Sequence, residues 1–566
     1  MGTVEFYKLP QWVKYAALAA AASLLFFPML GRVHLFDWDE VNFAECAREM
    51  IVSKDYLRAQ IDFMPFWEKP PFFIWMQVLS MKMFGIGEFA ARFPNACVGV
   101  FTVCFVYNAG KKVATERVGF WWAVLFACTW LPHLYFKSGI IDPAFNLFIF
   151  MAFYQLYLLN INNNKWIHAA LAGLFLGVAV LTKGPVAILV LVLSLLTLLV
   201  IKKGKTTYKI KNFLVITLFT LLPFGIWVLL ATLKHGTEYG KWFLTEFLSY
   251  QVRLFRTEDS DHGGPFIYHF VVLLFGCFPT SVFLFQFMGR KKEAATPKSG
   301  FTIRMWILFW VVLILFSIVR TKIVHYSSLC YFPLTFLGAT AINRLLTGED
   351  TLRSWVKILL LFTGTVMAGL IIAIPIVGLN KELLYPLIDD PFAVGNLHAD
   401  VSWHYWECIP GVFYFLAVIA GIVVLQKKRA RGLAIIYGVQ LITIQIALYQ
   451  FVPKIEGYTQ RAAIVFYRQF AGRDVYLHPI GFKSYAHLFY SNKQPFAAPQ
   501  YYLLNRKDKD SNAMQPAADE QWLLYGATDK PTYFISKIQD TANYAHIPGL
   551  QEFENKNGFV FYLRKQ

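Results

Sequence analysis

Charged residues are scarce in this sequence: they make up 16% of its 566 residues, whereas 57% are hydrophobic and 17% aromatic. Soluble domains carry about a quarter charged residues, so this composition excludes a soluble protein, a disordered chain and a collagen-like chain. Cysteine is scarce too, and seven residues, several of them in or beside apolar runs, imply no disulfide framework. No internal repeat, P-loop or dinucleotide glycine fingerprint is present. The composition indicates a protein whose solvent is lipid.

Apolar runs long enough to cross a membrane as helices recur along most of the chain. We identify thirteen, two of which are separated only by Leu181-Thr-Lys-Gly-Pro185, where Gly and Pro interrupt a helical run. Without that break the number falls to twelve. The approximate spans are 12–30, 90–110, 118–134, 140–160, 166–182, 184–201, 212–233, 265–287, 303–320, 323–343, 354–378, 408–426 and 431–451.

The basic residues predict the orientation of these helices. The net charge is +18, from 53 Lys and Arg against 35 Asp and Glu. With the N-terminus inside, the short basic loops at 111–117, 202–211, 290–304 and 427–431 all fall on the cytoplasmic side, which is the positive-inside pattern. This agreement requires the break at 181–185 and therefore favours thirteen helices over twelve. We interpret the basic excess as a topological signal, not as a nucleic-acid site, and the first run as an uncleaved helix.

The outer side receives the long connections at 31–89, 234–264 and 380–407, and a tail that begins near residue 453. In the tail, DVYLHPI, PTYFISKI and GFVFYLRK are typical of strands, whereas EGYTQRAAIVFYRQF and FKSYAHLFY have helical periodicity. We therefore predict a membrane domain over 1–452 and a small extracytoplasmic α/β domain over 453–566.

Polar residues are concentrated in the first outer loop, at 36–49 and in Phe66-Trp-Glu-Lys-Pro-Pro71. Because charges beside apolar helix ends are costly, they are functional candidates. The spacing of Asp39, Phe43, Ala47 and Met50 predicts an interfacial amphipathic helix. Alternatively, these charges form only a solvated face.

Several motifs in this loop and beyond it resemble the GT-C glycosyltransferases, in particular the group of lipid A aminoarabinose transferases and protein O-mannosyltransferases. The resemblance covers roughly residues 10 to 340 and implies a GT-C fold of about thirteen transmembrane helices. It also implies transfer of a sugar from a polyprenyl-phosphate carrier on the outer side of the membrane, with 31–89 as the catalytic loop. The motifs are Asp39-Glu40 with Phe-Ala-Glu45 and Ala-Arg-Glu49, Phe66 to Pro71, Glu88-Phe-Ala-Ala-Arg-Phe-Pro94, Ile141-Asp-Pro143, Leu181 to Pro185, His262 before Gly-Gly-Pro265, and Thr321-Lys322 with His325-Tyr326.

The charge-derived topology supports the resemblance independently, because it places the polar motif residues on one side of the membrane. An outward active site needs a donor that has already crossed the bilayer, which favours a lipid-linked sugar over a soluble nucleotide sugar. The residues placed outside are Asp39, Glu68, Lys69, Asp142, Lys183, His262 and Lys322.

Cations are expected to bind the donor, because breaking the glycosidic bond leaves negative charge on the phosphate. Each could instead be a cation at a helix end that reaches toward water. A tyrosine at an interface is also common in aromatic belts. The candidates for phosphate or substrate binding are Lys69, Lys183, Arg253, Lys322, Tyr326 and Glu40.

Two carboxylates are candidates for catalysis. Asp39 is placed to take a proton from an acceptor hydroxyl or to orient it. Asp142 either assists or caps the helix that begins at Pro143. Asp37-Trp-Asp39 matches the Asp-x-Asp metal motif only superficially, since no nucleotide-binding domain surrounds it.

The resemblance also implies a divalent metal, zinc, magnesium or manganese, at Glu68 and His262. Two ligands are fewer than a structural zinc needs, so water or substrate would have to complete the shell. Alternatively, His262 is an ordinary loop histidine.

We therefore expect a glycosyltransferase of the bacterial inner membrane that transfers a hexose or pentose with inversion. The donor is of the undecaprenyl-phosphate type, and the acceptor is lipid A, another glycolipid, a glycan or a protein. The alternative is a transporter or flippase of a lipid-linked glycan, which would predict inverted repeats and a polar site near the bilayer midplane.

The predicted topology can be tested with single cysteines in a variant that lacks the natural ones. Because Gly204 is predicted to be cytoplasmic and Asp62 to be outside, a membrane-impermeant thiol reagent applied to intact cells should label Cys at 62 and not at 204. Permeabilised cells, in which both sites should react, provide the control. Labelling at 204 in intact cells would contradict the assignment of every loop.

Overall fold

The computed structural model describes residues 3–162, 165–204, 208–256, 263–287, 297–498 and 516–565. Each of the thirteen predicted apolar runs coincides with a helix or a pair of helices, which confirms a mainly α, multi-pass membrane architecture. The helices of this part are α1 (Thr3–Lys8), α2 (Gln11–Phe26), α5 (Glu88–Val113), α6 (Glu116–Ala127), α7 (Trp130–Tyr135), α8 (Asp142–Ile161), α9 (Trp166–Thr182), α10 (Val186–Ile201), α11 (Ile210–His235), α13 (Tyr268–Gly276), α14 (Thr280–Phe287), α15 (Pro297–Ile318), η1 (Val324–Cys330), α16 (Tyr331–Thr347), α17 (Ser354–Leu379), α19 (Ile409–Lys427), α20 (Arg429–Ile446), η4 (Ala447–Phe451) and α21 (Val452–Gly457).

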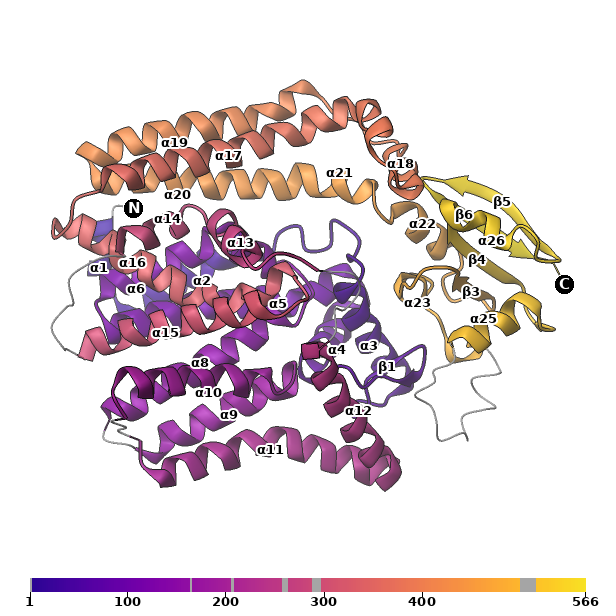
Figure 1. Cartoon of the computed structure of the whole chain (residues 1–566), viewed down its shortest axis with the longest axis horizontal. Coiled ribbons are helices and arrows are strands. Elements are labelled where there is room, and N and C mark those ends of the chain that lie inside the picture. Colours follow the sequence, from indigo (N-terminus) through magenta and orange to yellow (C-terminus); the bar gives the residue numbers. More distant parts are fainter. Residues whose placement is uncertain are drawn as a thin grey trace.

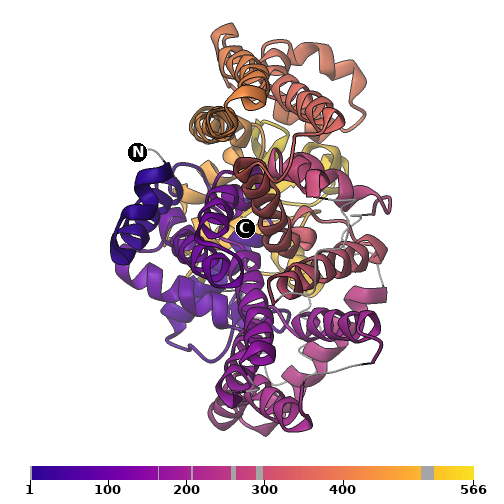
Figure 2. The ribbon, with the colours of Figure 1, turned by 90° about the vertical axis from the view of Figure 1, so that its left-hand side faces the viewer.

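Among the described residues, eight helices are long and apolar enough to cross a membrane alone, or nine if one bent pair counts as a span. The number thirteen is therefore not confirmed. Viewed along the bundle, α17, α19 and α20 lie at one side and α11 at the opposite side (Figure 2).

The shorter apolar helices α9 and α10 meet at the predicted break, where Gly184 has a φ of +122°. Two helices at this point, as the Gly-Pro sequence predicts, are thus confirmed.

The run at 265–287, predicted as one span, is helical but broken in the middle. It forms α13 and α14, which meet at an angle of 108°. Pro279 at the junction has no backbone N–H and disfavours helical geometry in the preceding residue, so the helix cannot continue through it.

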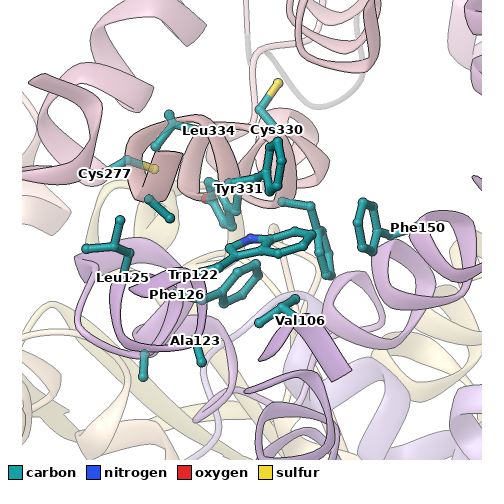
Figure 3. Packing of buried hydrophobic residues seen from close by; sticks show 14 of the residues in the cluster. Val106, Trp122, Ala123, Leu125, Phe126, Phe150, Cys277, Cys330, Tyr331 and Leu334 are labelled. Carbon is teal, nitrogen blue, oxygen red and sulfur yellow. The ribbon is translucent and has the colours of Figure 1, made fainter. Parts of the chain in front are cut away.

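Aromatic side chains fill the core of the membrane part. Trp122 on α6 is fully buried and its indole N–H donates to Thr335 Oγ1 at 3.0 Å, which satisfies its one polar group. Figure 3 shows Trp122 and Phe126 beside Tyr331, with Phe150 approaching from another helix. The Phe150 ring stacks on Phe332 at a centroid distance of 4.4 Å. These contacts join α6, α8 and α16 into one unit.

The segments predicted to lie outside, referred to below as the outer segments, gather at one end of the bundle, where the C-terminal domain also lies (Figure 1). The predicted strands and helices of that domain are confirmed. Its sheet has the order β3-β4-β6-β5, with β3 and β4 parallel and the other pairs antiparallel. The outer segments are α3 (Asp39–Ser53), β1 (Gln60–Ile61), β2 (Met64–Pro65), α4 (Phe72–Phe84), α12 (Thr237–Arg256), η2 (Lys381–Leu387), α18 (Pro391–Leu397) and η3 (Tyr405–Cys408). The C-terminal elements are α22 (Arg461–Gln469), β3 (Tyr476–Pro479), α23 (Ala486–Tyr490), η5 (Pro495–Ala497), α25 (Pro516–Tyr525), β4 (Thr532–Lys537), η6 (Ile538–Asp540), α26 (Thr541–Tyr544), β5 (Leu550–Lys556) and β6 (Phe559–Arg564).

The helix predicted near Asp39 is confirmed as α3, but a solvated or interfacial face is wrong. All residues from Glu40 to Met50 are buried. Apolar residues of α3, including Val41, Ala44 and Met50, share one core with Phe466 and Phe561 of the C-terminal domain. The first outer loop and the C-terminal domain are therefore packed as a single body.

Because α3 is buried, its charges are neutralised inside the protein. The fully buried Arg48 guanidinium donates to both oxygens of Glu45, at 2.7 and 2.5 Å, and to the backbone carbonyl of Lys493 at 2.7 Å. Lys493 in turn lies 2.6 Å from Asp62. These contacts fix the C-terminal domain to the outer loop.

Removing one partner of this buried pair should loosen the C-terminal domain. Arg48→Met leaves the Glu45 carboxylate unpaired, which should cost about 3 to 5 kcal/mol of unfolding free energy. Thermal unfolding in detergent and limited proteolysis of the C-terminal domain would measure the loss. The double variant Glu45→Gln/Arg48→Met should recover much of the stability, and an Arg48→Met protein as stable as wild type would contradict the role of this pair.

Candidate active site

Five of the polar residues described here converge where helices begin or end, at the end of the bundle that was predicted to lie outside. Asp39 is the first residue of α3, Asp142 the first of α8, and Lys183 follows the last residue of α9. Lys69 precedes α4, and His325 lies in η1. The break between α9 and α10 and the turn before α8 thus bring residues from distant parts of the sequence together.

Asp142 lies at the centre of this group. Its carboxylate is buried and accepts a hydrogen bond from Lys183 Nζ at 2.6 Å. His325 Nε2 lies 3.8 Å from Asp142 Oδ2 and also 3.8 Å from Asp39 Oδ2. Asp39 is 37% exposed, so it is the carboxylate of the pair that a ligand can reach. The imidazole therefore connects an accessible carboxylate to a buried one.

Cations gather around two tyrosines beside these carboxylates. Lys69 donates to Tyr250 Oη at 3.3 Å, and its ammonium lies 4.9 Å from the centre of the Tyr250 ring. The Arg253 guanidinium lies 5.5 Å from the same ring. Lys183 lies 5.4 Å from the ring of Tyr326. Two cations on one aromatic ring form a site that favours an anionic ligand.

Two other predicted residues make their hydrogen bonds within the protein. Glu40 is buried against Arg92 at 3.0 and 2.7 Å and accepts from the backbone N–H groups of Phe36 and Gly139. Burial alone would raise the pKa of Glu40, but the charge and hydrogen bonds of Arg92, together with the two backbone N–H groups, outweigh burial and the pKa is lowered. Lys322 donates to backbone carbonyls at the end of α15, including that of Ser317 at 2.7 Å. Their roles in substrate binding stay predictions, and the geometry shows them holding segments together.

Sequence reasoning did not select His325 as a site residue, although its motif was noticed. The charges that act on it most strongly are those of Asp142, Lys183, Asp39 and Lys69. Only the packing of η1 against α8 and α3 brings these groups together. The available signal was a histidine directly beside a predicted substrate-binding tyrosine in an outer loop.

The metal hypothesis involves Glu68 and His262. Glu68 is half-buried and directly precedes Lys69, and His262 lies outside the described residues. Within the part of the chain that the structure describes, no three His, Cys, Asp or Glu residues lie together in an arrangement that could hold an ion. The described residues thus do not form a metal site by themselves, and a metal stays a prediction.

Comparisons with known proteins show which sequences and folds this chain resembles. Residues 68–227 match the family model described as dolichyl-phosphate-mannose-protein mannosyltransferase. An undecaprenyl phosphate-alpha-4-amino-4-deoxy-L-arabinose arabinosyl transferase of Edwardsiella ictaluri is 26% identical over 351 residues, 61% of each chain. The same-named protein of Pectobacterium carotovorum is 25% identical over 436 residues, 71% of this chain and 74% of the relative. The aligned region thus spans less than two thirds of the first of these relatives.

The fold extends beyond the aligned sequence. The crystal structure of ArnT from Cupriavidus metallidurans bound to undecaprenyl phosphate superposes with a TM-score of 0.74 at 18% identity, covering 98% of each chain. The GT-C fold that the motifs predict is thus confirmed, apart from the number of helices, and the superposition extends over the C-terminal domain.

The ion pair of Asp142 and Lys183 can be tested without an activity assay. Lys183→Met leaves the buried Asp142 carboxylate without its cation and should reduce the free energy of unfolding by about 3 kcal/mol. Thermal unfolding in detergent is the measurement. The double variant Asp142→Asn/Lys183→Met removes both charges and should recover most of the loss, whereas equal instability of both variants would exclude this explanation.

Proposed function

We propose that this chain, a GT-C protein of the aminoarabinose-transferase type, transfers a sugar from a polyprenyl-phosphate donor to an acceptor at the outer face of a bacterial inner membrane. The acceptor class is lipid A, another glycolipid, a glycan or a protein. The observation that carries the proposal is the meeting of Asp39, His325 and Asp142 with the cations Lys69 and Lys183 at the outer helix ends. The relatives named as undecaprenyl phosphate-dependent transferases support the donor class.

The orientation follows from the same proposal. The N-terminus is cytoplasmic and the C-terminal domain periplasmic, as the one-sided basic loops indicate. The site residues then face the compartment in which a lipid-linked donor is present and soluble nucleotide sugars are not.

The transfer proceeds as a single displacement. The acceptor oxygen attacks the anomeric carbon while the bond from that carbon to the phosphate oxygen breaks, and the electron pair stays with the phosphate. Lys69 and Arg253, on the Tyr250 ring, stabilise the phosphate charge, with Lys183 nearby. Inversion at the anomeric carbon follows from attack opposite the leaving group.

Asp39 takes the proton of the acceptor hydroxyl. It is the exposed carboxylate of the group, whereas Asp142 is buried and paired with Lys183. His325, 3.8 Å from both carboxylates, orients Asp39 and connects it to Asp142. The base thus stands at the accessible end of a row of polar side chains that runs from Asp39 past His325 to Asp142.

Substitution of Asp39 tests this proposal and separates it from transport. Asp39→Asn preserves the shape and removes the base, so turnover with an undecaprenyl-phosphate sugar donor in liposomes should fall about 10²- to 10⁴-fold. Donor binding should remain, because lysines and not Asp39 bind the phosphate. Asp389→Asn, at an exposed acidic residue after η2, is the matched control and should behave as wild type.

Wild-type turnover by Asp39→Asn would refute the catalytic assignment. A different result would favour a transporter of a lipid-linked glycan: no detectable transfer with wild-type protein, together with a cellular phenotype that Asp39→Asn preserves.

A further inference from the structure

The C-terminal domain extends one loop, residues 480–485, to the rim of the candidate site. The Tyr485 ring packs edge-on against Trp38 at a centroid distance of 5.4 Å. Lys483 Nζ lies 4.6 Å from the centre of the Trp38 ring and 5.5 Å from that of Tyr485. Trp38 directly precedes Asp39 in the sequence. An ammonium group of the C-terminal domain is thus held on the residue next to the proposed base.

This loop is fixed at both ends. Asp37 faces the Ser484 hydroxyl and the backbone N–H of Tyr485, which stabilise its carboxylate although burial raises its pKa overall. At the other end, the backbone N–H of Ile480 donates to the carbonyl of Ile535 at 2.8 Å, and Gly481 packs so near the Tyr544 hydroxyl that a Cβ would lie 2.8 Å from it. Because neither end can shift freely, Lys483 is presented in a defined place.

Lys483 differs from nearby lysines of the C-terminal domain in its ion-pair partners. Lys493 and Lys530 of the same domain are each paired with an aspartate at 2.6 Å. Lys483 is exposed, and within the described ranges no carboxylate lies within ion-pair distance of it. Its ammonium lies over two aromatic rings, which accept no strong hydrogen bond from its three N–H donors. They are available to a ligand.

The surroundings indicate what such a ligand would be. The acidic residues Asp37, Asp39 and Glu68 repel an anionic acceptor that approaches the base. Burial raises the pKa of Tyr485, and the negative charges of Glu68 and Asp37 add to the increase. A cation beside Asp39 offsets this repulsion. The cations around Tyr250 are assigned to the donor, so Lys483 remains for the acceptor.

We propose that Lys483 is an acceptor-binding residue: seated on Trp38, it binds an oxyanion of the acceptor, a phosphate or a carboxylate, and so selects acceptors by charge. This inference rests on the proposed function. It gives the C-terminal domain a direct part in substrate choice, since its loop completes the acceptor side of a site otherwise built from the membrane part.

The test uses the full-length protein in nanodiscs with two probes, lipid A carrying its phosphates and the same lipid after enzymatic dephosphorylation. Lys483→Gln should raise the KM for the phosphorylated probe about 5- to 20-fold, as expected for loss of one partly exposed charge-assisted contact, and leave kcat within about twofold. The KM for the dephosphorylated probe should not change. Lys483→Arg, which keeps the charge, should retain most of the preference.

Lys82→Gln is the matched control. Lys82 is also exposed and also lies over an aromatic ring, 4.1 Å from the centre of Tyr56, but it is in the last turn of α4, away from the site. This variant should show wild-type constants with both probes. The comparison separates loss of acceptor recognition from loss of an ordinary cation on an aromatic ring.

Binding of both probes without donor, measured by native mass spectrometry, keeps the inference independent of turnover. If wild-type protein binds the phosphorylated probe preferentially and Lys483→Gln abolishes the preference, the inference is supported even where no transfer is detected, and only the proposed function fails. Equal binding of both probes by wild-type protein, or an unchanged preference in Lys483→Gln, would overturn the inference.

Discussion

Burial of α3 on every side is the constraint from which the rest of the site follows. A helix with charges at Glu40, Glu45, Arg48 and Glu49 can be buried only if the protein supplies their partners. Arg92 from α5 meets Glu40, and the segment around Lys493 meets Arg48. These contacts fix the direction of the helix, and its first residue, Asp39, is left at the accessible end.

The same constraint separates the charged residues that hold the structure together from those that a ligand can reach. Buried pairs such as Glu40 with Arg92 and Asp142 with Lys183 are fully engaged and hold elements in place. Asp39 and Lys69 sit where ligands can approach, and their charges act together on His325. The site thus combines a rigid framework of buried ion pairs with a few charged side chains that a ligand can reach. This arrangement suits a reaction in which negative charge moves from the acceptor to the phosphate.

The sequence was sufficient for the parts of the fold that depend on local patterns. The apolar runs became helices, the Gly-Pro break separated α9 from α10, and three strands of the C-terminal sheet were predicted correctly. Strand β5 was missed because it is an edge strand with exposed side chains on both faces, so it has no alternating pattern. The bend between α13 and α14 depends on a single residue, Pro279, within an otherwise continuous apolar run.

Long-range contacts could not be predicted in the same way. The loop positions of Asp39, Lys69, Asp142 and Lys183 followed from topology, but the partner of each did not. Nothing in the local pattern distinguishes Lys322, whose amine is bound to the end of α15, from Lys69, whose amine faces Tyr250. His325 became recognisable only when η1 was seen between two carboxylates.

The core shared by the first outer loop and the C-terminal domain affects how such proteins can be recombined. Side chains near Val41 and Phe561 interlock although more than five hundred residues separate them in the chain. A chimera that exchanged only the C-terminal segment would place foreign side chains against the native α3. Acceptor specificity would be transferred with less disruption by exchanging 31–89 and 453–566 together, because these two distant segments of the chain form one packed unit.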